Sequence, residues 1–236
     1  MRILAFIPAR SGSKGLKDKN IKEMCGKPLV AHTIQAAIDS GIFDCVHVST
    51  DSEHYADISK SYGADVPFLR TPELSDDQAS SWDAVKFTLE QYKKRGIEFD
   101  MVGLLQPTSP LRTGDDINGA YQFFLEKNAN AVISVCETDH SPLWSDTLPI
   151  DCNMNGFVDK KYREIPRQNM PVYYRVNGAI YLFKKECLSD IDALYDHGCY
   201  GYIMSREQSI DIDQRMDFVV AEAIMREKVN AKRIDE

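Results

Sequence analysis

Hydrophobic and polar residues follow two alternating patterns along most of the chain. Short, nearly continuous apolar runs, typical of buried strands, occur at residues 2–7, 46–50, 66–69, 101–105, 131–136, 175–183 and 200–205. Between them lie segments with helical character, at residues 28–40, 53–62, 80–94, 115–127 and 216–226. This alternation predicts an α/β fold with a mostly parallel, doubly wound (Rossmann-like) sheet in a single domain spanning residues 1–236.

The alternation stops between Glu137 and Tyr173. This stretch is rich in proline and has little helical periodicity. A structureless loop of that length is unusual inside a compact domain. We therefore expect an excursion with some structure of its own at about residues 138–170, serving either as a lid or as a dimerisation arm.

The first predicted strand leads into a basic, glycine-containing segment, residues 7–21 (IPARSGSKGLKDKNI). Glycine allows backbone N–H groups to approach phosphate oxygens closely, and Arg10 and Lys14 supply the opposite charge. The spacing of Gly12 and Gly15 matches neither a Walker A loop nor the dinucleotide-binding fingerprint. The segment therefore predicts a phosphate site of another class, the alternative being a solvated basic turn.

Two further polar residues follow predicted strands. Asp51 comes after the strand at 46–50, and Gln106 after the strand at 101–105. In parallel α/β sheets ligands bind beyond the carboxyl ends of the strands. We therefore expect Asp51, Gln106 and the Arg10/Lys14 segment to share one rim of the sheet.

Asp211 and Asp213 form a second chemical signal, in the sequence SIDID. Residues two apart in an extended segment face the same way, so both carboxylates point together while Ile210 and Ile212 point to the core. Adjacent carboxylates repel unless a cation or a shared proton lies between them. Mg²⁺ bridged to substrate phosphates satisfies this arrangement. The alternative is that Asp213 caps the following helix.

Other polar residues are weaker candidates for the site. Gln106 and Asn177 are amides beside turn-forming residues, and they suit recognition of hydroxyl, amide or base edges as well as ordinary turn hydrogen bonding. Arg167, in the predicted excursion, has a guanidinium that could grip a carboxylate, or it is a solvated loop residue. No histidine is placed with a serine or cysteine as in known nucleophile motifs, so covalent catalysis is not indicated.

Composition limits the partners. The net charge of −8 argues against a nucleic-acid partner, because nucleic-acid-binding domains are usually basic. The six cysteines are scattered without zinc spacing, which is typical of a reducing compartment. Neither a signal peptide nor an apolar run of membrane-spanning length occurs. We expect a cytoplasmic protein that binds a small anionic ligand, with no membrane association.

Five ordered segments resemble motifs of the CMP-N-acylneuraminate cytidylyltransferases (CMP-sialic acid synthetases). The related Kdo cytidylyltransferases differ in the first of them, because they lack its SGSKG run. The five segments, which extend over nearly the whole chain, are residues 7–20 (IPARSGSKGLKDKN), 48–51 (VSTD), 104–112 (LLQPTSPLR), 177–181 (NGAIY) and 209–213 (SIDID).

The resemblance implies a reaction, a cofactor and an assembly. Members transfer CMP from CTP to the anomeric hydroxyl of a nine-carbon 2-keto acid, releasing pyrophosphate. They use Mg²⁺, for which Mn²⁺ is an alternative. The excursion at 138–170 is similar to the family's dimerisation arm, which reaches the neighbouring active site, so a homodimer is implied.

The resemblance also assigns roles to residues. The matching positions are Ala9, Arg10, Ser13, Lys14, Asn20, Arg70 and Ser81 for the nucleotide, Gln106, Arg167, Asn177 and Tyr181 for the sugar acid, and Asp211 and Asp213 for the metal. Of these, Arg10, Lys14 and Asp211 are the expected catalytic residues. Arg10 and Lys14 stabilise charge on the pyrophosphate, and Asp211 acts as a metal ligand or, as the alternative, as a general base.

Several alternatives stay open at this point. The segments PLW at 142–144 and Asn169-Met170 differ from sialic-acid enzymes, so legionaminic or pseudaminic acid is an alternative acceptor to N-acylneuraminate. Kdo is a more distant one. A nucleotide-sugar glycosyltransferase shares the α/β sheet and metal carboxylates, but consumes no free CTP. A non-catalytic nucleotide-binding relative would bind CTP without releasing pyrophosphate.

Overall fold

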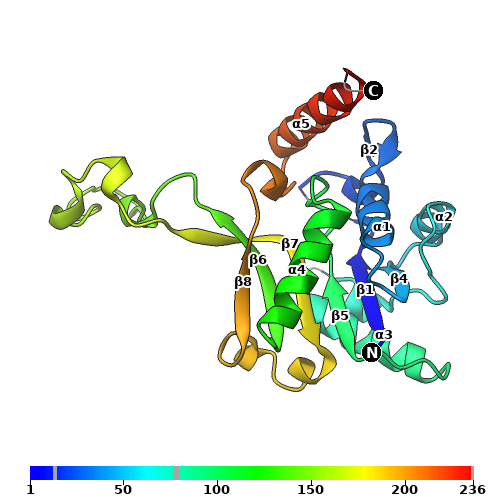
Figure 1. Cartoon of the computed structure of the whole chain (residues 1–236). Coiled ribbons are helices and arrows are strands. Elements are labelled where there is room, and N and C mark those ends of the chain that lie inside the picture. The colour runs from blue at the N-terminus through cyan, green and yellow to red at the C-terminus, as the bar shows by residue number, and fades with distance from the viewer. Residues whose placement is uncertain (13–14, 77–79, 235–236) are drawn as a thin grey trace.

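The computed structural model contains one six-stranded sheet, and it describes residues 1–12, 15–76 and 80–234, the last four of these by their backbone alone. The sheet order is β4-β1-β5-β7-β6-β8, and β7 runs antiparallel to both neighbours while the other adjacent pairs are parallel (Figure 1). The strands are β1 (Ile3–Pro8), β4 (Cys45–Ser49), β5 (Met101–Leu104), β6 (Ala131–Glu137), β7 (Tyr174–Lys184) and β8 (Cys199–Ile203). The predicted mostly parallel α/β fold is confirmed.

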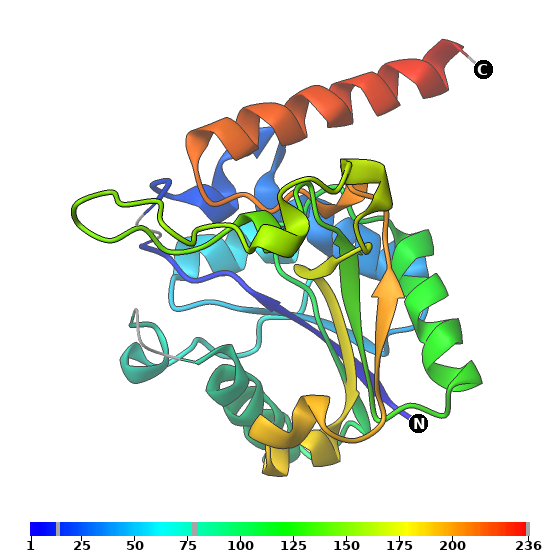
Figure 2. The ribbon, with the colours of Figure 1, turned by 90° about the vertical axis from the view of Figure 1, so that its left-hand side faces the viewer.

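Helices cover both faces of this sheet. α1 (Leu29–Ser40) and α4 (Gly114–Glu126) pack on one face, and α3 (Ser81–Lys93) packs on the other. α2 (Glu53–Ser61) follows β4, and α5 (Arg215–Ile234) lies across one end of the molecule (Figure 2). None of the helices in the described part of the chain is both long enough and apolar enough to cross a bilayer.

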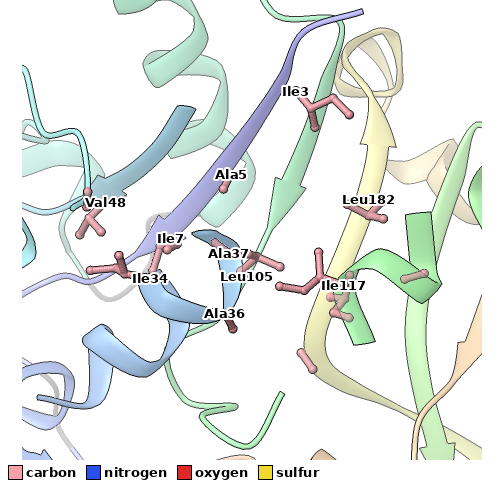
Figure 3. Packing of buried hydrophobic residues seen from close by; sticks show 14 of the residues in the cluster. Ile3, Ala5, Ile7, Ile34, Ala36, Ala37, Val48, Leu105, Ile117 and Leu182 are labelled. Atoms are coloured by element: carbon pink, nitrogen blue, oxygen red, sulfur yellow. The ribbon is translucent and has the colours of Figure 1, made fainter. Parts of the chain in front are cut away.

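The alternating residues of β1 explain the two layers. Ile3, Ala5 and Ile7 face α1 and α4, whereas Leu4 and Phe6 face the opposite side, as the period of two requires. On the first side Ile34 of α1 and Ile117 of α4 are fully buried against the sheet (Figure 3). This packing fixes the strands whose carboxyl ends carry the site.

Three local features differ from the sequence prediction. The strand expected at 66–69 does not form, and an isolated bridge between His47 and Asp65 stands in its place. Pro67 follows closely and lacks the N–H that a longer ladder needs. A short hairpin of β2 (Glu23–Met24) and β3 (Lys27–Pro28) was not predicted, and α5 extends past the expected end at residue 226 to residue 234.

The segment between β6 and β7, residues 138–173, projects away from the body of the molecule and is called the arm (yellow-green in Figure 1). It contains the short 3₁₀ turns η3 (Pro142–Trp144), η4 (Lys160–Tyr162) and η5 (Arg167–Asn169). Most of its side chains are exposed, including the apolar Ile150 and Val172. The arm thus has structure of its own without a buried core.

Candidate active site

A cleft of about 590 Å³ opens at the carboxyl ends of β1 and β5. β4 and β5 lie on either side of β1, so the strand order reverses there, which is where open α/β sheets bind ligands. The cleft brings together seven of the residues expected at the site, namely Arg10, Asn20, Arg70, Ser81, Gln106, Asp211 and Asp213. Ser13 and Lys14 lie outside the described residues.

Two guanidinium groups line one side of the cleft. Arg10 donates from Nη1 to the carbonyl oxygens of Asp76 and Ser75, at 3.0 and 3.3 Å. Arg70 is nearly buried and donates to the hydroxyl and carbonyl of Ser49, each at 3.1 Å. Burial lowers the pKa of Arg70 to about 10, with the charge of Asp51 opposing the shift and that of Arg10 adding to it. Arg70 therefore stays positive at neutral pH.

Lys19 adds a third cation to the cleft. Its Nζ donates to the carbonyl of Ile212 and forms a 3.4 Å ion pair with Oδ1 of Asp213. Asn20 also lines the cleft and donates from Nδ2 to the carbonyl of Arg10 at 3.0 Å. The sequence places Lys19 among the basic residues of the first loop, but its pairing with a carboxylate 194 positions away appears only in the fold.

Asp211 and Asp213 also line the cleft. Oδ1 of Asp211 is buried and has no hydrogen-bond partner among the described residues. Burial raises the pKa of Asp211, a hydrogen bond from Thr108 counters this in part, and the nearby charge of Asp213 raises it further. The Asp213 side chain is 76% exposed, and Ile212 between them is fully buried in the core.

The Asp213 side chain accepts no hydrogen bond from the described N–H groups of α5, so it does not cap this helix. The backbone N–H groups of Asp213 and Gln214 both donate to Oδ2 of Asp217, at 3.0 and 2.7 Å. The Asp213 carboxylate instead faces Lys19. It therefore stays available at the cleft.

This carboxylate pair fits a cation that takes most of its ligands from elsewhere. An unpaired buried oxygen on Asp211 and an exposed carboxylate on Asp213 offer two protein ligands. In the described part of the chain no cluster of three or more acidic, histidine or cysteine side chains forms a closed metal cage. Mg²⁺ suits such a site, because it commonly binds one or two carboxylates and completes its shell with phosphate oxygens and water.

A second cavity of about 630 Å³ adjoins the cleft and shares Ser81 and Gln106 with it. Tyr181 lines it together with Trp82 and Tyr195. Burial raises the pKa of Tyr181 to about 12, so its hydroxyl remains a hydrogen-bond donor at neutral pH. The two cavities thus offer a charged compartment and an aromatic one on either side of Gln106.

Gly178 shapes the boundary between these cavities. Its φ of +76° lies in the left-handed region that favours glycine. A Cβ at this position would lie 2.6 Å from Oε1 of Gln106. The glycine therefore leaves room for the Gln106 amide.

Three expected site residues are not brought into the described lining of either cavity. Ala9 is buried behind it, with its N–H donating to Ser49. Asn177 is buried, and its amide is bonded to Ser134 and Ser209. Arg167 lies in the arm, where it donates to the carbonyl of Asp139.

The sequence of this chain is similar to those of known cytidylyltransferases. Residues 4–143 match the family model described as Cytidylyltransferase. An N-acylneuraminate cytidylyltransferase from Escherichia coli O18:K1:H7 is 40% identical over 99% of this chain, and one from Streptococcus agalactiae serotype V is 42% identical over 93%. The alignments cover 54% and 52% of those relatives, so the chain spans about half their length.

A third relative is matched over nearly its full length. The CMP-N,N'-diacetyllegionaminic acid synthase of Legionella pneumophila is 36% identical over 95% of this chain and 97% of the relative. A solved CMP:2-keto-3-deoxy-manno-octonic acid synthetase in complex with CTP has the same fold, with a TM-score of 0.73 at 15% identity, covering 97% of this chain and 100% of that one. The chain therefore belongs to the cytidylyltransferase family.

Proposed function

We propose that the chain transfers a cytidylyl group from CTP to a nine-carbon 2-keto sugar acid, with N-acylneuraminate as the acceptor and pyrophosphate as the second product. The observation that carries this proposal is that one cleft is lined both by Arg10, Arg70 and Lys19 and by the Asp211/Asp213 pair. A triphosphate needs the cations, and a phosphate-bound metal needs the carboxylates.

The proposed reaction is a displacement at the α-phosphorus of CTP. The oxygen of the anomeric hydroxyl bonds to the α-phosphorus and gives up its proton to water, the bond to the bridging oxygen breaks, and pyrophosphate leaves with the electron pair. Arg10, together with Lys14 as the sequence predicts, stabilises the negative charge that builds up on the leaving group. Positioning and charge neutralisation lower the barrier of such a displacement without a covalent nucleophile.

Mg²⁺ is the proposed cofactor, with Mn²⁺ as a substitute, and Asp211 and Asp213 would hold it. When bound, the ion polarises the α-phosphate and lowers the pKa of the attacking hydroxyl. In the alternative form of the proposal Asp211 itself accepts the hydroxyl proton, which the raised pKa of this buried carboxyl favours.

The acceptor is assigned to the second cavity, where Gln106 and Tyr181 would contact it. N-acylneuraminate is the first choice because the relatives named for it are 40–42% identical over the segment they share with this chain. Legionaminic and pseudaminic acid are the alternatives, since relatives named for these acids are 36% and 31% identical. Asn177 is proposed to act behind this cavity, by holding the irregular part of β7 through Ser134 and Ser209.

We further propose a homodimer built through the arm. The arm projects from the body, exposes apolar side chains such as Ile150 and Val172, and holds Arg167 outside the described lining of its own cleft (Figure 1). An arm that reaches a second copy would bring Arg167 to the sugar-acid carboxylate there.

The six cysteines are free thiols. The expected cytoplasmic location stays a prediction.

The test is pyrophosphate release from CTP and Mg²⁺ with N-acetylneuraminic, legionaminic, pseudaminic and Kdo acids in parallel. We expect release with one nine-carbon acid, preferentially N-acetylneuraminic acid, and none with ATP, GTP or UTP. Preference for another of the four acids identifies the alternative acceptor.

Two outcomes distinguish the other function classes. A glycosyltransferase would release a nucleoside diphosphate from a nucleotide sugar and leave CTP intact. A binding-only relative would bind CTP in calorimetry and release no pyrophosphate with any acid. Either result would contradict the proposed function.

A further inference from the structure

The corner between β4 and α2 contacts the segment of residues 9–20, called the basic loop, which the structure describes except for residues 13 and 14. Asp51, directly after β4, accepts two hydrogen bonds from Ser11, one from its backbone N–H to Oδ1 at 2.7 Å and one from its hydroxyl to Oδ2 at 2.6 Å. Both carboxylate oxygens are therefore used on one residue of the loop. Burial alone would raise the pKa of Asp51, but the two bonds from Ser11, together with its own backbone N–H and the charge of Arg70, leave this pKa below its usual value.

The same corner also contacts the other end of the loop. Tyr55, four residues after Asp51, donates its hydroxyl to Oδ1 of Asp18 at 3.0 Å. Asp18 has a φ of +52°, a conformation that is uncommon for a residue with a side chain. Tyr55 is nearly buried, and its backbone N–H donates to the side chain of Ser52, the N-cap of α2, so this contact comes from a fixed support.

The two contacts flank residues that line the cleft. Arg10 precedes Ser11, and Lys19 and Asn20 follow Asp18. Gly15 lies against the metal-site segment, because a Cβ on it would lie 2.6 Å from the carbonyl oxygen of Asp213. A shift of the loop would therefore move three polar cleft residues and press on the carboxylate segment.

We propose that Asp51 and Tyr55 are positioning residues that hold the basic loop in the shape that binds the CTP triphosphate. This inference rests on the proposed function. Neither residue belongs to the described lining of the cleft, so Tyr55 acts through Asp18, and Asp51 acts through Ser11 and through its charge on the nearby Arg70. Simple electrostatics makes the opposite prediction for Asp51, because removing a negative charge near an anionic ligand should tighten binding.

The experiment compares Asp51→Asn, Ser11→Ala and Tyr55→Phe with Asp57→Asn as the matched control. Asp57 lies on α2 with its side chain 76% exposed, so its substitution removes the same charge without touching the loop. Losing hydrogen bonds to a charged group should raise the Kd and KM for CTP by about tenfold in Asp51→Asn and about threefold in the other two loop variants. The KM for the sugar acid and both constants of Asp57→Asn should change less than about twofold.

Hydrogen exchange of the peptide spanning residues 9–20 separates this inference from the proposed function. Faster exchange in Asp51→Asn than in the control supports the positioning role of Asp51, even if no acid yields pyrophosphate. Absence of pyrophosphate release would contradict the proposed function alone. CTP binding in Asp51→Asn that equals or exceeds that of the wild type would overturn the positioning role. Unchanged hydrogen exchange in this variant, or an equal rise in KM for CTP and the sugar acid, would also overturn it.

Discussion

The cleft and the arm are built in opposite ways. Cleft residues are held by bonds between distant parts of the chain, such as Lys19 to Ile212 and Ser11 to Asp51. The arm's bonds stay mostly within the arm itself, such as Arg163 to the carbonyl of Val158 and Arg167 to the carbonyl of Asp139. The cleft also stands on a sheet with a buried core, whereas the arm is largely exposed. One chain therefore fixes the proposed nucleotide and metal residues by itself, whereas the arm lacks such support from the body, which favours the proposed homodimer.

This difference implies a division of labour between the two regions. Substitutions in the cleft should affect CTP binding and the chemical step. Substitutions in the arm should affect the sugar acid alone, because Arg167 is proposed to act on a neighbouring copy. The predictions below test this separation.

The largest effect is expected for Asp211→Asn and Asp213→Asn. Each should lower turnover by about 10²-fold or more, because the metal site loses a charged ligand. The Asp211 carboxyl has a pKa raised by burial, so a neutral amide there should leave the melting temperature equal or slightly higher. Pyrophosphate release and thermal denaturation measure the two effects. Near-normal rates in both variants would contradict the metal role.

Arg167→Ala should produce the next largest effect. Losing a charge-assisted bond to the acceptor carboxylate should lower kcat/KM for the sugar acid by about 10- to 100-fold. Calorimetry should find CTP affinity unchanged, because the cleft is complete without the arm. Arg163→Ala, also on the arm, is the matched control and should behave like the wild type. Weaker CTP binding in Arg167→Ala would break the proposed separation.

Acid should destabilise the body through His47. Burial lowers the pKa of this histidine to about 4, below its usual value near 6.5. The unfolded chain then binds more protons between these values, so the free energy of unfolding should fall by about 2 kcal/mol from pH 7 to pH 5. Urea denaturation of His47→Gln should give a flatter pH dependence than the exposed control His54→Gln. Equal slopes would contradict the assignment.

The smallest effect is expected when alanine replaces either of two glycines with similar backbone conformations. Gly178 in the body and Gly156 in the arm have φ values of +76° and +83°. Alanine at either position should cost about 1 kcal/mol of stability. Only Gly178→Ala should also raise the KM for the sugar acid, because its Cβ meets Gln106 while the space around Gly156 is open. A similar rise in both variants would show that Gln106 is not involved.

Much of the fold could be predicted because its signals are local. The apolar runs and helical periodicity marked nearly every strand and helix, and Arg10 and Gln106 could be placed at one rim because each follows a strand. The strand expected at 66–69 does not form, because Val66 is buried by packing in the core and Pro67 ends the pairing with β4. The hydrophobic pattern alone does not distinguish a buried loop residue from a strand residue.

The rest of the site depends on contacts that sequence separation conceals. Asn177 resembles a ligand-binding amide, but at an irregularity in the β6/β7 pairing its side chain bonds to the buried Ser134 and Ser209. Asp51 was expected on the rim, and only the fold shows that both its oxygens bind Ser11. Such roles follow from tertiary packing and not from residue type.

The most direct test of the central claim is the identity of the bond broken in CTP. Phosphorus NMR of the wild-type protein with CTP, Mg²⁺ and N-acetylneuraminic acid should show the CTP signals replaced by equal amounts of pyrophosphate and a single phosphodiester of the CMP-sugar. Formation of CDP and inorganic phosphate would contradict the account. So would CTP that stays intact with N-acetylneuraminic, legionaminic, pseudaminic and Kdo acids, in protein shown to bind CTP.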